Sequence, residues 1–497
     1  MSGLIKAVRS HLQARNGCQG WTDVQIVMAL VLLNLAGGDS ASDLEVLEQD
    51  EGFTRILRRA ELDGLPRAQR RELERRWRKE RRRTVPSPTA ALRYLATFHD
   101  AEQEKLRVPG KAFIPAPNAN LRMFQRVNAD FVAFVQERDP QEWGTLDLDA
   151  TLLETHKDTA LYCYKGFKAY QPLNIWWAEQ ELILFTEFRD GNVPAGFQML
   201  RVLQEALACV PEGVGKIRVR SDSAGYQHDL LRYMASGTHP RFGVIEFAVS
   251  ADVTPEFKQT VATVPESDWK PFYRDDNGTR VKTKREWAEV PFVPDGMGFN
   301  KKTTPYRYIA TRELLEQQPL PGAEEQQRLP FPTMSWHGQR YKVFGIVTNF
   351  RRPLEDEVDR EIERTRKKRP EDETEAWAGD EVIRWLNQRC GRSEAAHATM
   401  KSELAGGKVP SGEFGKNAAW WWAMILAFNL NAAMKRLVLG GSWVHRGLKA
   451  IRFHLIAISG RIIRGGRELK LRIGRGFNTL KILLDARTKM QAWALAG

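Results

Sequence analysis

The stretch IRVRSDSAGY at residues 217–226 contains the pattern that decides the fold. Ile217–Asp222 predicts a short strand that ends on an aspartate, and the small residues behind it predict a sharp turn. A helix is expected at about 226–235, and Phe242–Ser250 predicts the next strand. Alternating strands and helices are typical of an α/β sheet, which commonly exposes catalytic groups at its strand ends.

The residues before this stretch continue the pattern. Thr145–Asp149 alternates as a strand does, Glu181–Phe188 predicts another strand, and Gly196–Cys209 has helical spacing. We therefore expect residues 143–250 to form the first part of an α/β core with a mixed sheet.

The residues after it interrupt the pattern and then restore it. Residues 251–340 are rich in Pro, Trp, Lys and Thr with short β-like pieces, which predicts a β-rich insertion. The second part of the core is expected at 341–435, beginning with a strand at Tyr341–Asn349. The mixed charges of Arg351–Glu375 predict an exposed helix or loop.

Residues 1–105 predict an all-α, helix-turn-helix-like DNA-binding domain. Residues 67–83 hold ten Lys or Arg against three Glu, and Ser87-Pro88 then starts a helix that carries Arg93. The alternative is a plain helical bundle with a solvated charged face.

The C-terminal residues 436–497 predict a basic helical tail that contacts DNA. From residue 441 onward they hold 12 Lys or Arg against two acidic residues. In the apolar helix before the tail, Trp420–Trp422 could stack on bases, but such a run more often belongs to a core.

The composition narrows the classes of partner. The 497 residues include 75 Lys or Arg and 62 Asp or Glu, a net charge of +13, which indicates a polyanionic partner such as DNA, RNA or an anionic membrane. No apolar stretch reaches the roughly 20 residues of a membrane span, and no signal peptide is recognised at the start. Four cysteines without a CxxC pair suit a reducing cytoplasm.

Three carboxylates stand where a metal site could form. Asp149 and Asp222 end strands, while Glu394 lies on a helical stripe with His397 and Lys401. Two strand-end aspartates and a glutamate offer the oxygen ligands that Mg²⁺ prefers, and two such ions can assist phosphodiester displacement. Taken singly, each acid is more often an ordinary turn, cap or solvated residue than a metal ligand.

The segments around these acids resemble one family. The resemblance is carried by LDLDATLLETHKDTALYCYKGFKAYQPLN (146–174), RDGNVPAG (189–196), VRSDSAGY (219–226), NQRCGRSEAAHATMKSELAGG (387–407) and NAAWWWAMILAFNLNAAMKRL (417–437). These strings are similar to the DDE transposases of insertion sequence family 1380, over most of the chain.

The resemblance implies an RNase H-like catalytic core whose metal ligands are Asp149, Asp222 and Glu394. The wider group carries a Tyr-x2-Arg-x3-Glu-x6-Lys signature, which Glu394 and Lys401 match. Its upstream half does not match, because Cys390 and Asn387 stand at the Arg and Tyr positions.

Other residues follow from the resemblance with alternatives left open. Arg389, which lies one position from the signature's arginine, and Arg392 are the candidates for that arginine. The expected DNA contacts are these two arginines together with His397, Lys401 and Arg93. Asp147 shares a strand face with Asp149 and would be the first ligand if the motif were shifted by two residues.

The function implied is that of a bacterial insertion-sequence transposase, in the nucleoid-associated cytoplasm. As a homodimer it would bind terminal inverted repeats and target DNA, free a 3′-OH at each transposon end and join it to the target. Two Mg²⁺ ions, or Mn²⁺ in their place, would be the cofactors. The alternatives are an inactive or repurposed sequence-specific DNA-binding protein, a stand-alone nuclease and an RNA-binding protein.

Overall fold

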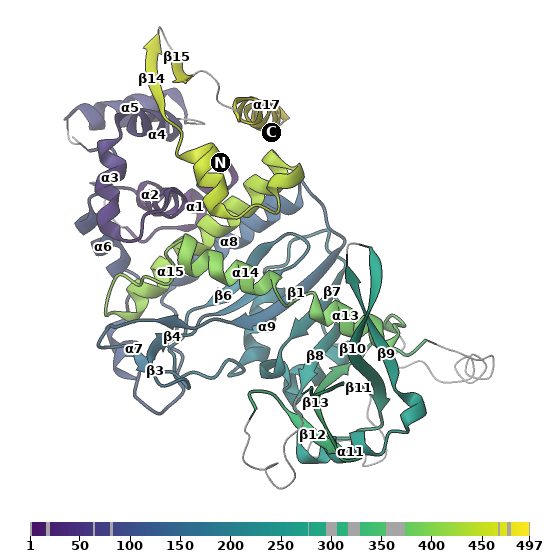
Figure 1. Cartoon of the computed structure of the whole chain (residues 1–497). Helices are drawn as coiled ribbons and strands as arrows, with labels where there is room; N and C mark the ends of the chain where they lie inside the picture. The colour runs from purple at the N-terminus through teal and green to yellow at the C-terminus, as the bar shows by residue number, and fades with distance from the viewer. Residues whose placement is uncertain are drawn as a thin grey trace.

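The computed structural model describes most of the chain. The described residues are 2–15, 20–62, 65–79, 83–276, 278–294, 306–316, 329–353, 373–465, 468–474 and 479–496. Helices gather at one end of the molecule, and a long sheet runs from its middle to the opposite end (Figure 1).

The described residues before the sheet form eight α-helices. These are α1 (Ser2–His11), α2 (Asp23–Ala36), α3 (Leu44–Gln49), α4 (Glu51–Glu61), α5 (Arg67–Lys79), α6 (Pro88–Ala96), α7 (Ala101–Lys105) and α8 (Ala119–Gln136). Helices α1, α2 and α6 share one continuous hydrophobic core with the sheet and α15 (Phe414–Ala433). A separate domain at 1–105, and its binding of DNA, remain predictions.

One mixed sheet organises the rest of the molecule. Its order is β6-β5-β1-β7-β8-β13-β11-β10-β9, and β12 pairs with β13. The strands are β1 (Trp143–Ala150), β5 (Leu173–Trp177), β6 (Leu182–Glu187), β7 (Lys216–Ser221), β8 (Glu246–Ala251), β9 (Lys270–Asp276), β10 (Thr279–Val290), β11 (Arg307–Leu314), β12 (Thr333–Trp336) and β13 (Gln339–Thr348).

The pairing of β1 places the two strand-end aspartates together. β1 is antiparallel to β5 but parallel to β7, with Leu148 opposite Ser221. Parallel strands end at the same edge of a sheet. Asp149 comes directly after Leu148 and Asp222 directly after Ser221, so the two aspartates lie at one edge. β7 and β8 are also parallel, which continues this edge.

The remaining elements cover the sheet or extend from it. They are the small sheet β2 (Leu153–Glu154), β3 (Leu161–Tyr162) and β4 (Lys168–Tyr170), and the helices α9 (Met199–Leu207), α10 (His228–Ala235), α11 (Pro255–Ala262), α13 (Gly379–Asn387) and α14 (Arg392–Ala398). The mixed sheet expected from sequence is confirmed. Strand β5 was not foreseen, because Leu173–Trp177 is buried at every position and so does not alternate.

The β-rich segment at 251–340 continues the central sheet. β13 pairs with β8 of the core on one side and with β11 on the other. The described strands β9 to β12 therefore lengthen the sheet beyond β13, at the end of the molecule opposite the helices (Figure 1).

Helix α15 is the centre of the core. It is apolar on all sides and buried along nearly its whole length, including Trp420, Trp421 and Trp422. Asn429 attaches it to the sheet and to α8, since its Oδ1 accepts from Ile183 N of β6 at 2.7 Å and its Nδ2 donates to Asn128 Oδ1 of α8 at 2.7 Å. The core interpretation of the tryptophan run is confirmed.

The C-terminal region differs from the helical tail expected. It contains π-helical turns at Met434–Leu439 and Arg452–Ile456, the short α16 (Leu448–Ile451), the strands β14 (Gly460–Gly465) and β15 (Glu468–Ile473), and α17 (Leu480–Ala496). Residues 460–473 pair as an antiparallel ribbon. The physical reason is the period-two alternation of aliphatic and cationic residues in LKLRI at 469–473, which fits a strand, and the β-branched pair Ile462 and Ile463 in the strand opposite.

Two further expectations concern other parts of the chain. Most of Arg351–Glu375, at residues 354–372, lies outside the described residues. Among the described helices none is by itself long and apolar enough to cross a membrane, although a sharply bent pair, Asp23–Ala36 with Ala41–Gln49, passes on length and composition.

The sheet register generates a first prediction. Asp147 is fully buried opposite Arg220, which donates to both its carboxylate oxygens, Nε to Oδ1 at 2.6 Å and Nη2 to Oδ2 at 2.9 Å. We expect Asp147→Ala to lower the free energy of unfolding by roughly 3–5 kcal/mol, because it leaves a buried guanidinium unpaired. Urea unfolding measures this, with the exposed Glu102→Ala as the control. A loss no larger than that of the control would contradict a structural role for Asp147.

Candidate active site

Asp149 lies at the carboxyl edge of the sheet, and side chains from the segment around α14 contact its carboxylate. Its Oδ2 atom accepts the Ser393 hydroxyl at 2.5 Å, and Arg389 Nη1 lies 3.1 Å from the same oxygen. His397 Nδ1 lies 3.8 Å away. Asp149 keeps 20% of its side chain exposed, so a ligand from solvent can reach it.

Asp222 follows β7 at the adjacent strand end. Its Oδ1 accepts the backbone N–H of Ala224 at 3.0 Å, which fixes the turn predicted from the small residues there. Burial raises the pKa of the Asp222 carboxyl, the negative charge of Asp149 raises it further, and the positive charge of Arg389 lowers it. The charges of Asp149 and Arg389 thus both influence the ionisation of Asp222, and the three side chains form one electrostatically coupled cluster.

Glu394 lies outside this group. It is exposed on α14, one residue beyond Ser393 and therefore about 100° further round the helix. Within the described parts of the chain, no three His, Cys, Asp or Glu side chains are close enough to hold a metal ion. The structure brings together two of the three expected ligands, with Ser393 rather than Glu394 facing Asp149.

His397 is held by a buried chain of hydrogen bonds. Its Nε2 lies 3.3 Å from Asn174 Nδ2, and Asn174 Oδ1 accepts from Thr186 Oγ1 at 2.6 Å. Thr186 Oγ1 accepts from Trp421 Nε1 at 2.9 Å. An amide nitrogen only donates, so His397 Nε2 is the acceptor and its proton sits on Nδ1, toward Asp149.

The protonation of His397 follows from the same burial. Burial lowers its pKa more than the charge of Asp149 raises it, so the ring is neutral near neutral pH. Sequence reasoning missed Asn174, Thr186 and Trp421. Asn174 and Trp421 lie within strings that resemble the family, LDLD…QPLN and NAAWWW…MKRL, whereas Thr186 had no such signal.

Asp147 has a different environment from Asp149. Arg220 occupies both of its oxygens and also donates through Nη1 to the Trp385 carbonyl at 2.7 Å. A carboxylate that is fully buried and doubly paired has no oxygen left for a ligand. Between the two alternatives, the geometry favours Asp149 as the accessible acid.

The expected DNA contacts are distributed unevenly. Arg389 is nearly buried beside Asp149, and Lys401 is close enough for its charge to lower the pKa of His397. Arg392 is half-exposed and lies 3.3 Å from Glu181. Arg93 is exposed on α6, away from the residues that contact Asp149.

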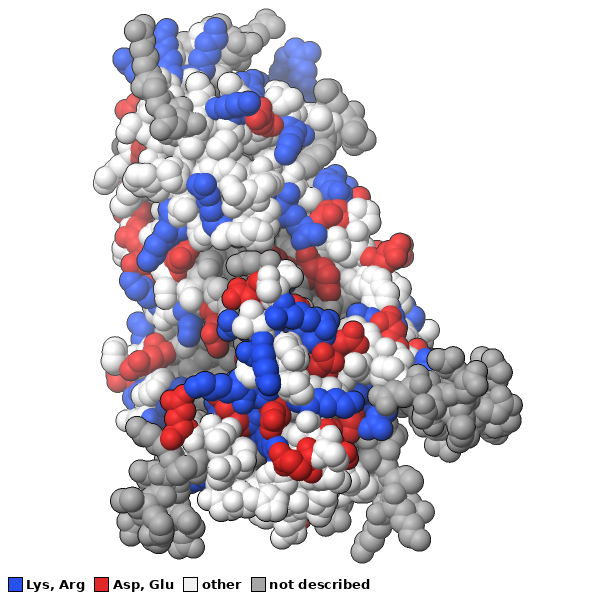
Figure 2. Space-filling view, turned by 45° about the vertical axis from the view of Figure 1, so that its right-hand side comes forward, with Lys and Arg blue, Asp and Glu red and all other residues white. Residues whose placement is uncertain are grey.

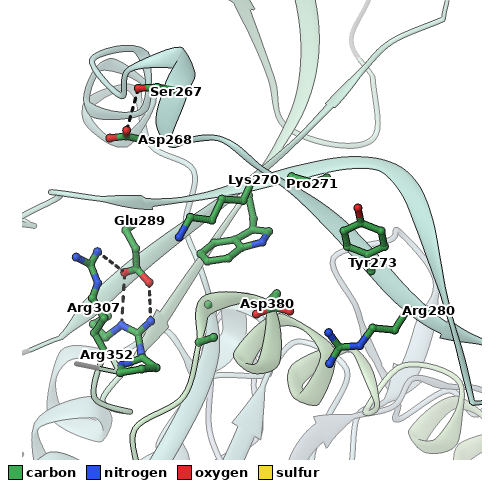
Figure 3. Close-up of a pocket in the computed structure, with 14 residues that line it drawn as sticks. Ser267, Asp268, Lys270, Pro271, Tyr273, Arg280, Glu289, Arg307, Arg352 and Asp380 are labelled. Carbon is green, nitrogen blue, oxygen red and sulfur yellow. Dashed lines mark hydrogen bonds and ion pairs between the residues drawn. The ribbon is translucent and has the colours of Figure 1, made fainter. Parts of the chain in front are cut away.

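A cavity of about 780 Å³ lies elsewhere, between β9, β10, β11 and the start of α13 (Figure 3). Its floor includes Glu289, which Arg307 holds by two hydrogen bonds and which lies 3.7 Å from Arg352. None of the site residues expected from sequence lines it. The cavity is therefore a feature of the outer sheet and is distinct from the aspartate pair.

The electrostatics of the pair generate a second prediction. Because folding raises the pKa of Asp222, its ionisation opposes folding above that raised pKa, and the cost disappears below the ordinary Asp pKa of about 3.9. We expect Asp222→Asn to raise the melting temperature in metal-free buffer at neutral pH. The gain should shrink as the pH falls toward 4.

Asp149→Asn provides the matched comparison, measured by the same thermal scans. It should lower the melting temperature, because Arg389 loses its carboxylate partner. An Asp222→Asn protein that is less stable than the parent at neutral pH would contradict the assigned electrostatics.

Comparison with known proteins places the chain in a family. The model for transposase DDE domain group 1 matches residues 3–293, which include Asp149 and Asp222 but not Glu394. No match was found among curated proteins. Among solved structures, the chain is similar to the cryo-EM structure of piggyBac transposase synaptic complex with hairpin DNA. The identity is 10% and the TM-score 0.37, over 90% of this chain and 82% of that chain. Because the family model covers more than half of its residues, the chain belongs to the transposase DDE domain group 1 family.

Proposed function

We propose that the chain is the transposase of a bacterial insertion sequence, of family 1380. In this proposal it cuts DNA at the transposon ends and joins each freed 3′-OH to target DNA by metal-dependent phosphoryl transfer. The observation that carries it is the pair Asp149 and Asp222, at adjacent strand ends in a chain of the DDE family.

The sheet supports an RNase H-like core for this activity. Strands β6, β5 and β1 are antiparallel neighbours, and β7 and β8 continue in parallel with β1. This order puts both aspartates on one edge, where DNA can reach Asp149.

The donor set fits divalent metal ions of the Mg²⁺ or Mn²⁺ kind. The negative charge of Asp149 raises the pKa of the Asp222 carboxyl, a repulsion that a cation between the two carboxylates would relieve, and the Arg389 guanidinium beside Asp149 supplies part of that positive charge. Bound there, two ions would stabilise the attacking and leaving oxygens of a phosphodiester. Asp149 and Asp222 would hold them with Glu394, and Lys401 would bind a backbone phosphate.

Glu394 needs a change of helix register to reach Asp149. Five positions separate Arg389 from Glu394, whereas four separate them in the signature, so the segment holds one extra residue. A π-helical turn accommodates one extra residue, and one lies directly behind α14, at Thr399–Glu403. If that turn moved to the N-terminal side of Glu394, the helix would rotate by one residue position. Glu394 would then face Asp149 in place of Ser393.

DNA recognition and the pairing of the two transposon ends would depend on elements outside the catalytic core. The helices before β1, including Arg93, would recognise terminal inverted repeats, and Arg392 and the basic C-terminal region would contact the DNA backbone. A homodimer in the bacterial cytoplasm would bring two ends together. The second candidate, an inactive or repurposed DNA-binding protein, is favoured by the exposed position of Glu394, away from Asp149.

Replacing the glutamate tests the activity. We expect Glu394→Gln to reduce Mg²⁺-dependent strand cleavage at terminal-repeat DNA by at least about a hundredfold, because it removes a charged ligand, and to leave DNA binding within about twofold. Cleavage and strand transfer are measured on labelled ends, with the exposed Glu137→Gln as the matched control. Cleavage at the parental rate would refute the assignment, and a parent with no metal-dependent product would favour the second candidate.

Replacing the serine tests the register change. We expect Ser393→Ala to increase Mn²⁺ affinity severalfold, because it removes the 2.5 Å hydrogen bond that holds Asp149 to the present register. Calorimetric titration of Mn²⁺ measures this. Ser335→Ala, at an exposed position on β12 and outside the moving segment, is the control. Weaker Mn²⁺ binding in Ser393→Ala would show that the serine supports the metal site.

A further inference from the structure

The C-terminal ribbon has two chemically different faces. Residues directly opposite each other in an antiparallel pair share a face. Arg461 pairs with Arg472 and Ile463 with Lys470, so one face carries the cations. Ile462 pairs with Leu471 on the other face, which is aliphatic there.

One residue of this face, Ile462, is seated on the N-terminal helices, whereas Leu471 remains exposed. Ile462 packs on α4 at Gly52, where an added Cβ would come within 3.1 Å of its Cγ1 atom. Arg55 of α4 also donates to the Ile462 carbonyl at 3.4 Å. Chain segments about 400 residues apart therefore form one surface, with α4, α5 and the ribbon at the same end of the molecule (Figure 1).

A second contact fixes the chain that leads into the ribbon. The Arg452 guanidinium donates to the carbonyls of Asn34 and Leu35 at the end of α2, at 2.6 and 2.7 Å, and to the Glu403 carbonyl. It thereby caps α2, whose last carbonyls lack partners within the helix. The ribbon is consequently attached to the N-terminal helices at two points.

Cations of the two strands lie close together on the cationic face. Arg461 and Arg472 are exposed and directly opposite each other, a like-charge arrangement that destabilises a strand pair. No carboxylate among the described residues pairs with either of them or with Lys470. Neighbouring helices add exposed cations, and Figure 2 shows Lys and Arg gathered at this end. The exposed arginines on α4 and α5 are Arg55, Arg59, Arg67, Arg70, Arg71 and Arg75.

We infer that the ribbon and the α4–α5 helices form one composite surface that binds double-stranded DNA. This rests on the proposed function and adds to it that the N- and C-terminal segments act as a single reader. A two-stranded ribbon has the width to enter the major groove, while cations on the flanking helices meet the phosphates. The polyanion supplies the charge that the Arg461–Arg472 pair lacks.

The charge pair provides the test. We expect Arg461→Ala/Arg472→Ala to bind a random-sequence linear duplex on the order of tenfold more weakly, with the slope of log K against log salt reduced by about 2. The full chain is used without Mg²⁺, in fluorescence anisotropy titrations at several salt concentrations. The control is Arg122→Ala/Arg126→Ala, which removes equal charge from exposed positions on α8.

Two further readouts separate DNA binding from a folding role. The melting temperature of the double variant should stay level or rise, because a like-charge repulsion is removed. Ile462→Ala, which loosens the ribbon from α4, should weaken duplex binding severalfold, whereas Leu314→Ala, at an exposed position on β11 outside the proposed surface, should not.

The inference fails if the double variant binds like the control. It also fails if the variant loses as much affinity for a single-stranded oligonucleotide as for the duplex, or if Ile462→Ala and Leu314→Ala bind alike. Since binding is measured without metal, these outcomes leave cleavage untouched. Absence of cleavage would in turn refute the proposed function without altering the result for the ribbon.

Discussion

The parallel pairing of β1 with β7 is the constraint on which the candidate site depends. It sets Leu148 opposite Ser221, so that the next residue on each strand is an aspartate at the same sheet edge. The buried pair of Asp147 and Arg220 reinforces this pairing one step earlier along the strands. A slip of one residue would turn Asp149 to the opposite face and separate it from the α14 segment.

That arrangement holds two acids close together at a cost to the fold. The burial of Asp222 and its proximity to Asp149 oppose ionisation, and Arg389 offsets part of the cost. A neutral His397, oriented by Asn174 from the core, completes the surroundings of Asp149 without adding charge. Sites that concentrate like charge in this way gain stability when a cation binds them.

The sequence was informative wherever a periodic pattern or a strand end was involved. The alternation around Thr145–Asp149 and the turn after Asp222 predicted the sheet edge correctly, and the all-round apolar character of Ala418–Ala433 predicted a buried helix. The strand at Leu173–Trp177 was missed because a fully buried strand does not alternate. That Ser393 rather than Glu394 faces Asp149 could not be predicted, since the rotation of a helix about its axis relative to a sheet edge is decided by tertiary packing and not by local sequence.

The position of α15 has a consequence for how the protein is made. The apolar helix α2 packs against α15, which leaves the ribosome only after nearly all of the sheet has been synthesised. During translation the apolar side chains of the N-terminal helices therefore stay exposed while hundreds of further residues are synthesised. Chains in such a state aggregate or recruit chaperones. A product terminated before residue 414 lacks the helix that completes this core, so the N-terminal segment is poorly suited to survive as an independent fragment in the cell.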